Sequence, residues 1–169
     1  MSKKGLIHVY TGNGKGETSA ALGITIRAAG NGLKCCFIQF LKGKPTGELS
    51  ILNKIPNITF IQTGRTDYNF HPTEKDRELA RKGLELANKL LPEFDLMVLD
   101  EINVAVHLNL IELKDVLELI KSKPLRLELI LTGRHASSEL IKLADYVTQF
   151  KLIKHPFYKN LKARKGIDY

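Results

Sequence analysis

The chain has 169 residues, of which 43% are hydrophobic and 26% are charged, and this composition is ordinary for one globular domain. No apolar run approaches the roughly 20 residues that a membrane-spanning helix requires, and the apolar stretch near the start is too short for a signal peptide, so we expect a cytoplasmic protein that does not enter a membrane. The formal net charge of +8 favours anionic partners, among which nucleotides, nucleic acids and acidic metabolites all remain open.

Apolar runs alternate with helical patterns along the chain, which is typical of an α/β fold with a parallel sheet. The elements predicted in the first part of the chain are strands at Leu6–Tyr10, 33–41 and Ile58–Thr63, a helix from Thr18 to about Ala29, and a short connecting segment around Leu49–Ile55. Gly30 and Gly32 are expected to close the helix, because glycine adopts the left-handed cap conformation easily. Cys35 and Cys36 are adjacent on a strand, so their side chains should point to opposite faces and fill two buried positions rather than form a bridge.

A long helix is predicted in the middle of the chain, with Thr73 as its cap, Asp76 in its first turn and Pro92 at its end. The segment 94–101 is nearly all apolar, which predicts a central strand that is covered on both faces. The remaining predicted elements are helices at Val104–Leu108, Leu113–Ile120 and 137–144, and strands at Leu127–Thr132 and 146–153.

No repeat and no linker interrupts this pattern, so we predict a single domain over residues 1–169. Basic residues gather in a C-terminal tail at about 153–169. Two interpretations of this tail are open: a solvated, partly mobile segment, or a lid over a binding site.

The segment TGNGKGETS, residues 11–19, lies between the first strand and its helix, as a phosphate-binding loop does. The usual pattern, G-x-x-x-x-G-K-[ST], forms an anion-binding nest of backbone N–H groups at the start of a helix. Here Gly12 and Gly16 are one residue closer than that pattern, Thr11 occupies the expected outer position, and Glu17 stands where the loop lysine is expected. The predicted ATP-binding residues are Thr11, Gly12, Asn13, Gly14, Lys15, Gly16, Glu17, Thr18 and Ser19.

The later segment LMVLDE places Asp100 and Glu101 at the end of an apolar strand. An acid at this place can hold Mg²⁺ directly or through water, opposite the hydroxyl group of Thr18. The predicted metal ligands are therefore Thr18, Asp100 and Glu101. A further strand ends in LILTGR, so that Arg134 can reach the same edge of the sheet, where α/β proteins bind their ligands.

The segments YTGNGKGETSAALG, IQFLKG, MVLDE, LTGR, LADYV and KHPFYKNLKARKGIDY follow one another in this order. Together they resemble the corrinoid adenosyltransferases of the ATP:cob(I)alamin type, a family that acts in cobalamin synthesis and salvage, from about Gly5 to Tyr169. The resemblance implies transfer of the 5′-deoxyadenosyl group from ATP to the reduced cobalt of a corrinoid, with triphosphate as the leaving group. It also implies a RecA-like, three-layer P-loop fold with a mostly parallel sheet between helices, Mg²⁺ as the metal, a homodimer, and a reductase partner that supplies the reduced cobalt.

Two positions depart from what the resemblance implies. Family members commonly carry aromatic residues in the loop after the third strand, in a segment like TGFTW, where they press on the lower face of the corrinoid. This chain reads TGRTDYNF there, with Arg65 and Asp67 at those places, so Tyr68 and Phe70 just beyond them are the predicted corrinoid-binding residues. Ordinary packing of a long loop is the alternative interpretation of these two aromatic residues.

The second departure is Glu17, which removes a positive charge from the phosphate loop and adds a negative one. In adenosyl transfer, charge develops on the α-phosphate side, whereas a kinase or hydrolase must balance charge around a transferred γ-phosphoryl group. We therefore interpret the loop as adapted, with Lys15 and Arg134 as the predicted catalytic cations. A carboxylate here should weaken ATP binding unless it turns outward or meets Mg²⁺ or a basic partner.

Two other functions remain open from the sequence. A RecA-like ATPase that binds nucleic acid would suit the charge of +8, although the chain has no aromatic and basic motif of a known nucleic-acid-binding module. A non-catalytic regulator that binds ATP or a corrinoid without turnover would suit the carboxylate at position 17. We expect ATP and a corrinoid, and not nucleic acid, to be the partners.

Overall fold

The computed structural model describes residues 4–67 and 71–167. In these ranges six strands form one sheet in the order β3-β2-β4-β5-β1-β6, and every neighbouring pair is parallel. The strands are β1 (Ile7–Gly12), β2 (Cys35–Phe40), β3 (Ile58–Thr63), β4 (Leu96–Asp100), β5 (Glu128–Thr132) and β6 (Tyr146–Phe150).

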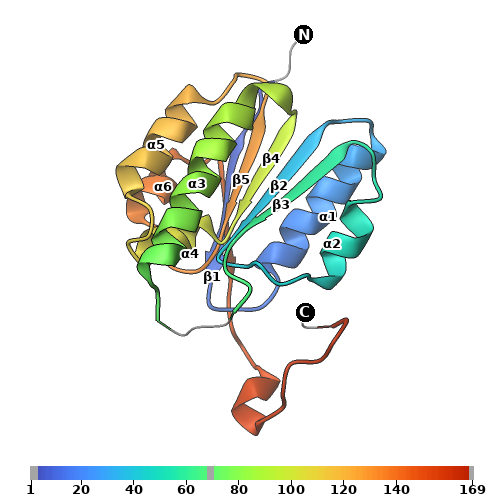
Figure 1. The fold of residues 1–169 in the computed structure, drawn as a ribbon, viewed down its shortest axis with the longest axis vertical. Helices are drawn as coiled ribbons and strands as arrows, with labels where there is room; N and C mark the ends of the chain where they lie inside the picture. The colour runs from blue at the N-terminus through green and yellow to red at the C-terminus, as the bar shows by residue number, and fades with distance from the viewer. Residues whose placement is uncertain (1–3, 68–70, 168–169) are drawn as a thin grey trace.

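Helices cover both faces of this sheet (Figure 1). Helices α1 and α2 lie on one face, and α3, α4, α5 and α6 lie on the other. Their bounds are α1 (Glu17–Gly30), α2 (Gly47–Leu52), α3 (Glu74–Leu90), α4 (Ile102–His107), α5 (Leu113–Ser122) and α6 (Ser138–Leu143), with short 3₁₀ turns at Leu91–Glu93 and Pro156–Lys159. The prediction of an α/β fold with a parallel sheet between two helical layers is confirmed.

The core is divided by the sheet into two clusters of buried side chains. Because side chains alternate along a strand, neighbouring residues belong to opposite clusters. Cys36 packs on the side of α3, and Cys35 packs on the side of α1, and both are free, fully buried thiols, as predicted. All five residues of β4 are buried, which confirms that this strand is central and covered on both faces.

The start of α3 agrees with the prediction from the sequence, whereas the end of α1 differs from it in part. Thr73 caps α3 and Asp76 lies in its first turn, as predicted, and the two residues also form a reciprocal capping box. Of the two glycines predicted to close α1, only Gly32 is left-handed, with a φ of 81°. The prediction for Gly30 is wrong because the helix continues through it, and the carbonyl groups of Ala28 and Ala29 accept hydrogen bonds from Asn31 and Gly32.

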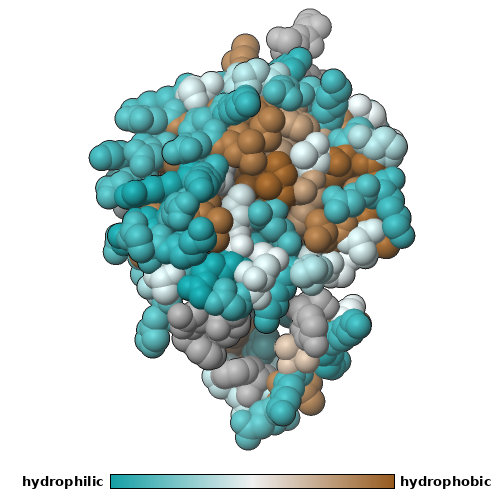
Figure 2. Space-filling view, in the orientation of Figure 1, coloured by the Kyte–Doolittle hydropathy of each residue, from teal (hydrophilic) through white to brown (hydrophobic). Residues whose placement is uncertain are grey.

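The carboxyl ends of the parallel strands meet at one end of the molecule, the lower end in Figure 1. After β6 the chain leaves the sheet at this end, makes the short turn at Pro156–Lys159 and returns toward α1 and α2. Apolar surface gathers over the middle of the face seen in Figure 2, whereas hydrophilic side chains cover most of its lower end. Among the described helices, none has the length and apolar character needed to cross a membrane.

Candidate nucleotide-binding site

The loop between β1 and α1 is held against the end of β6. The backbone N–H of Gly14 donates to the carbonyl oxygen of Phe150 at 2.7 Å. A Cβ on Gly12 would lie 2.3 Å from that oxygen, and a Cβ on Gly14 would lie 2.8 Å from the backbone of Phe150. Gly12 and Gly16 also have φ angles of 122° and 126°, a region that favours glycine. Glycine is therefore required in this loop both by its conformation and by its contact with β6.

The loop forms one wall of a cavity of about 540 Å³. Thr11 and Gly12 do not line this cavity, and the hydroxyl group of Thr11 instead accepts a hydrogen bond from the backbone N–H of Ala136 at 3.2 Å. The side chain of Asn13 accepts a hydrogen bond from Leu152, in the segment after β6. The predicted ATP-binding residues that do line the cavity are Asn13, Gly14, Lys15, Gly16, Glu17, Thr18 and Ser19.

Asp100, at the end of β4, is fully buried and accepts four hydrogen bonds. Its Oδ1 atom accepts from the hydroxyl groups of Thr18 at 2.9 Å and Thr132 at 2.7 Å. Its Oδ2 atom accepts from Gln39 at 2.9 Å and from the ammonium group of Lys42 at 3.4 Å. These partners come from α1, β5, β2 and the loop after β2, so one carboxylate fixes the relative positions of four segments around the cavity.

Glu101 follows in a left-handed backbone conformation, with a φ of 65°. Its backbone N–H donates to the hydroxyl group of Thr132 at 3.0 Å, and its carboxylate lies 3.5 Å from the ammonium group of Lys42. Burial raises the pKa of Glu101, and Asp100 adds to the rise, although Lys42 opposes it. Glu101 lines the cavity beside Thr18, so the structure brings the three predicted metal ligands to one place.

Glu17 turns inward, at the first position of α1. Only 8% of the residue is exposed, and its Oε2 atom has no hydrogen-bond partner in the part of the chain that the structure describes. Burial raises the pKa of Glu17 from 4.5 to about 7. The neighbouring carboxylates of Glu101 and Asp100 contribute to this rise, whereas the cations of Arg134 and Lys42 oppose it. The residue at the place of the loop lysine is thus a buried acid that faces two other acids.

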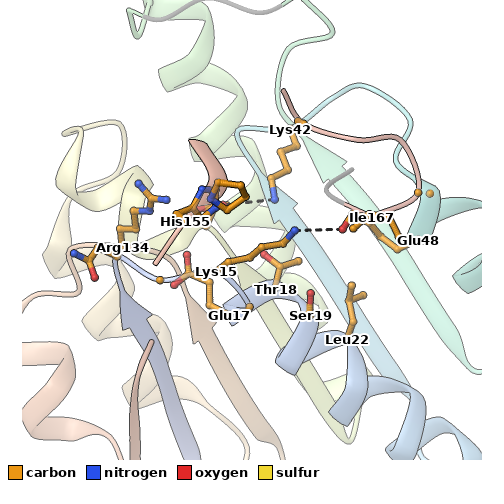
Figure 3. Close-up of a pocket in the computed structure, with 18 of the residues that line it drawn as sticks. Lys15, Glu17, Thr18, Ser19, Leu22, Lys42, Glu48, Arg134, His155 and Ile167 are labelled. Carbon is orange, nitrogen blue, oxygen red and sulfur yellow. Dashed lines mark hydrogen bonds and ion pairs between the residues drawn. The ribbon is translucent and has the colours of Figure 1, made fainter. Parts of the chain in front are cut away.

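The two cations predicted to be catalytic lie at the rim of the cavity (Figure 3). The ammonium group of Lys15 points across the opening and donates to the carbonyl oxygen of Ile167 at 3.4 Å. Arg134 is exposed on the opposite side, after a turn in which Asn103 donates to the carbonyl oxygen of Gly133 at 3.0 Å.

The wall opposite the loop is made by the C-terminal tail, which sequence analysis left with two open interpretations. Residues of this tail that line the cavity are His155, Pro156, Leu161, Lys162, Ala163, Gly166 and Ile167. No pattern in the tail itself points to this contact, because it depends on the path of the chain after β6. Sequence analysis also assigned no role to four further lining residues, namely Leu22, Lys42, Gly47 and Glu48, although Lys42 lies in the segment IQFLKG.

The predicted corrinoid-binding residues Tyr68 and Phe70 lie outside the described residues. On the near side of this loop, Arg65 forms an ion pair with Asp67 and donates to the hydroxyl group of Thr73 at 3.0 Å. Arg65 also lies 3.7 Å from Asp76, in the first turn of α3. Arg65 therefore ties the segment that follows β3 to the start of α3.

Comparisons with known proteins show which family this chain belongs to. A family model described as "ATP:corrinoid adenosyltransferase BtuR/CobO/CobP" matches residues 3–169. The chain belongs to this family. The family expected from the sequence is thereby confirmed.

Individual relatives of the ATP:corrinoid adenosyltransferase family agree over nearly the whole chain. A protein of Pseudomonas aeruginosa named corrinoid adenosyltransferase is 34% identical over 99% of this chain and 85% of its own length. Proteins with the same name from Sinorhizobium sp. and Escherichia coli K12 are 35% and 34% identical, over 99% and 100% of this chain and 81% and 88% of their own lengths. The similarity therefore includes the loop, the acidic end of β4 and the tail.

Proposed function

We propose that this protein transfers the 5′-deoxyadenosyl group of ATP to the reduced cobalt of a corrinoid and releases triphosphate. The observation that carries the proposal is the cavity between the phosphate loop and the tail, in a chain that matches the adenosyltransferase family along its length. In this reaction the cobalt atom attacks the 5′ carbon of the ribose with an electron pair. The bond between that carbon and the triphosphate oxygen breaks, and its electrons leave with the triphosphate.

The donor set around the loop suits Mg²⁺ bound together with a nucleotide. Among the described residues, no group of three or more His, Cys, Asp or Glu side chains could hold a metal by itself. Mg²⁺ commonly takes only one or two carboxylates and completes its shell with substrate phosphates and water. The carboxylate of Glu101 lines the cavity. The hydroxyl group of Thr18 donates its hydrogen bond to Asp100, which leaves the lone pairs of its oxygen available to a metal ion. The Oε2 atom of Glu17 has no hydrogen-bond partner among the described residues. These oxygen donors fit Mg²⁺, which would neutralise charge on the triphosphate when bound.

The remaining roles fall to groups of the chain itself. Residues 16–19 at the start of α1 line the cavity, and their backbone N–H groups would bind phosphate oxygens. Lys15 and Arg134, at opposite sides of the opening, would offset the negative charge that grows on the triphosphate as it leaves. The tail would close the cavity over the nucleotide and hold the 5′ carbon in line with the cobalt, since orientation alone can supply much of the acceleration of such a step.

The proposal extends to the setting of the reaction. Tyr68 and Phe70 would contact the corrinoid, a reductase would supply the reduced cobalt, and the protein would work as a cytoplasmic homodimer. The two thiols, Cys35 and Cys36, are both free, which suits a reducing compartment.

One assay tests the proposal directly. Purified protein is mixed with ATP, Mg²⁺ and chemically reduced cobalamin, and the cobalt–carbon product is followed by its absorbance. Formation of this product with equimolar triphosphate is the expected result. Binding of ATP and corrinoid without product would favour a regulator, and ATP hydrolysis stimulated by an oligonucleotide would favour an ATPase.

A further inference from the structure

The cavity is lined by several basic side chains, although the phosphate loop has Glu17 where a lysine is usual. Its lining residues include four lysine or arginine side chains, namely Lys15, Lys42, Arg134 and Lys162. Lys15, Arg134 and Lys162 belong to exposed residues at the rim or in the tail. Lys42 differs from them, because only 36% of its side chain is exposed and its ammonium group lies beside the acids at the end of β4.

Lys42 is fixed by the backbone on both sides. The preceding residue, Leu41, has a φ of 62° and turns the chain sharply after β2. The loop after β2 then runs in direct contact with the loop after β3. A Cβ on Gly64 would lie 2.2 Å from the backbone nitrogen of Lys42, and a Cβ on Gly43 would lie 2.2 Å from the carbonyl oxygen of Gly64. Two glycines thus allow a close crossing that holds Lys42 in place.

The ammonium group of Lys42 points toward Asp100 and Glu101, two of the predicted metal ligands. It lies 3.4 Å from Asp100 and 3.5 Å from Glu101, and Figure 3 shows it entering the cavity from the side opposite to Arg134. Two carboxylates at these distances hold the ammonium group of Lys42 in place and favour its charged form. Asp100 in turn accepts a hydrogen bond from Thr18, the residue that follows Glu17.

A lysine at position 17 of the loop would place its charge in the same region, since Glu17 faces Asp100, Glu101 and Lys42. A typical phosphate loop uses that lysine to bind the terminal phosphates. We infer that Lys42, which reaches the site from the end of β2, binds the triphosphate group in place of the loop lysine that Glu17 replaces. The inference rests on the proposed function only in taking the triphosphate of ATP as the ligand.

Binding of inorganic triphosphate, measured by calorimetry in the presence of Mg²⁺, tests this role without adenosyl transfer. Lys42→Met should weaken triphosphate binding at least about tenfold, because it removes a charged hydrogen bond. Adenosine affinity should not change. Lys44→Met is the matched control, since Lys44 is exposed, lies two residues further along and does not line the cavity, and it should retain affinity within about twofold.

A second measurement separates contact from a general effect of charge or folding. Lysines of the wild-type protein are reductively methylated with and without triphosphate, and the rate at each site is read by mass spectrometry. Triphosphate should slow the methylation of Lys42 at least about fivefold and leave Lys44 unchanged, because a bound phosphate shields only the ammonium group that it contacts. The inference is overturned if Lys42→Met binds triphosphate as tightly as wild type, or if triphosphate leaves the methylation rate of Lys42 unchanged. Neither result depends on whether a cobalt–carbon product forms, so this inference and the proposed function can fail separately.

Discussion

Replacing Glu17 by glutamine should stabilise the ligand-free protein, and the gain should depend on pH. The carboxyl group of Glu17 has a pKa near 4.5 in an unfolded chain and about 7 in the folded protein. Below pH 4.5 both states hold the proton, so the acid has no effect on the free energy of unfolding. Between the two values the unfolded chain loses this proton and the folded protein keeps it, so stability falls as the pH rises. Above pH 7 the loss is complete.

The size of the effect follows from the two pKa values. Each pH unit between them changes the free energy of unfolding by about 1.4 kcal/mol for one proton, which gives about 3 kcal/mol as the upper limit. Water that enters the cavity stabilises the charged form, so we expect a net gain of about 1–3 kcal/mol for Glu17→Gln at pH 8. At pH 4.5 the gain should shrink to less than about 0.5 kcal/mol.

Urea unfolding of wild type and Glu17→Gln at pH 8 and pH 4.5, without nucleotide or divalent cation, measures this difference. Glu85→Gln is the control, because Glu85 is exposed on α3 and does not line the cavity, and it should have the same small effect at both pH values. Equal stability of wild type and Glu17→Gln at pH 8 would show that the carboxylate is well solvated. A gain of the same size at both pH values would show that packing, and not charge, is responsible. Either result refutes the reasoning.

Three further predictions concern ligand binding. Glu17→Lys should tighten ATP binding about five- to thirtyfold at low salt, because reversing a charge near phosphate is worth roughly 1–2 kcal/mol after screening, and equal ATP titrations of both proteins would contradict this. Glu101→Ala should sharply raise the Mg²⁺ concentration needed for ATP binding, and an unchanged Mg²⁺ titration would remove this acid from the metal site. Alanine at Tyr68 or Phe70 should reduce adenosylation of cobalamin while ATP affinity stays the same, and an equal fall in both quantities would assign these residues a structural role.

The order of elements could be predicted from the sequence because each strand carries a local signal. The apolar run that forms β4 and the capping pair Thr73 and Asp76 are examples, since burial and helix starts depend on neighbouring residues. The sequence predicts helix α2 only as a short connecting segment. Its six residues bury a single side chain, Leu52, and they make too few turns to show the helical period of apolar residues.

The parts of the site that sequence analysis missed depend on contacts between distant segments. The proximity of Asp100 and Thr18 could be predicted, because a phosphate loop and an acidic residue at the end of a strand form a known combination. Lys42 could not, since its place depends on β2 lying next to β4 and on a left-handed turn at Leu41, which no local pattern indicates. The contact of Lys15 with Ile167 likewise joins residues that are 152 positions apart.

The crossing of Gly43 and Gly64 links two loops that would serve different substrates. One loop carries Lys42 to the triphosphate side, and the other leads through Arg65 toward the predicted corrinoid contacts. Their backbones touch without room for even a methyl group, so a shift of one loop toward the other must move both. A residue larger than glycine at either position would push the two loops apart and displace Lys42, so a substitution on the corrinoid side of the crossing would be felt on the triphosphate side.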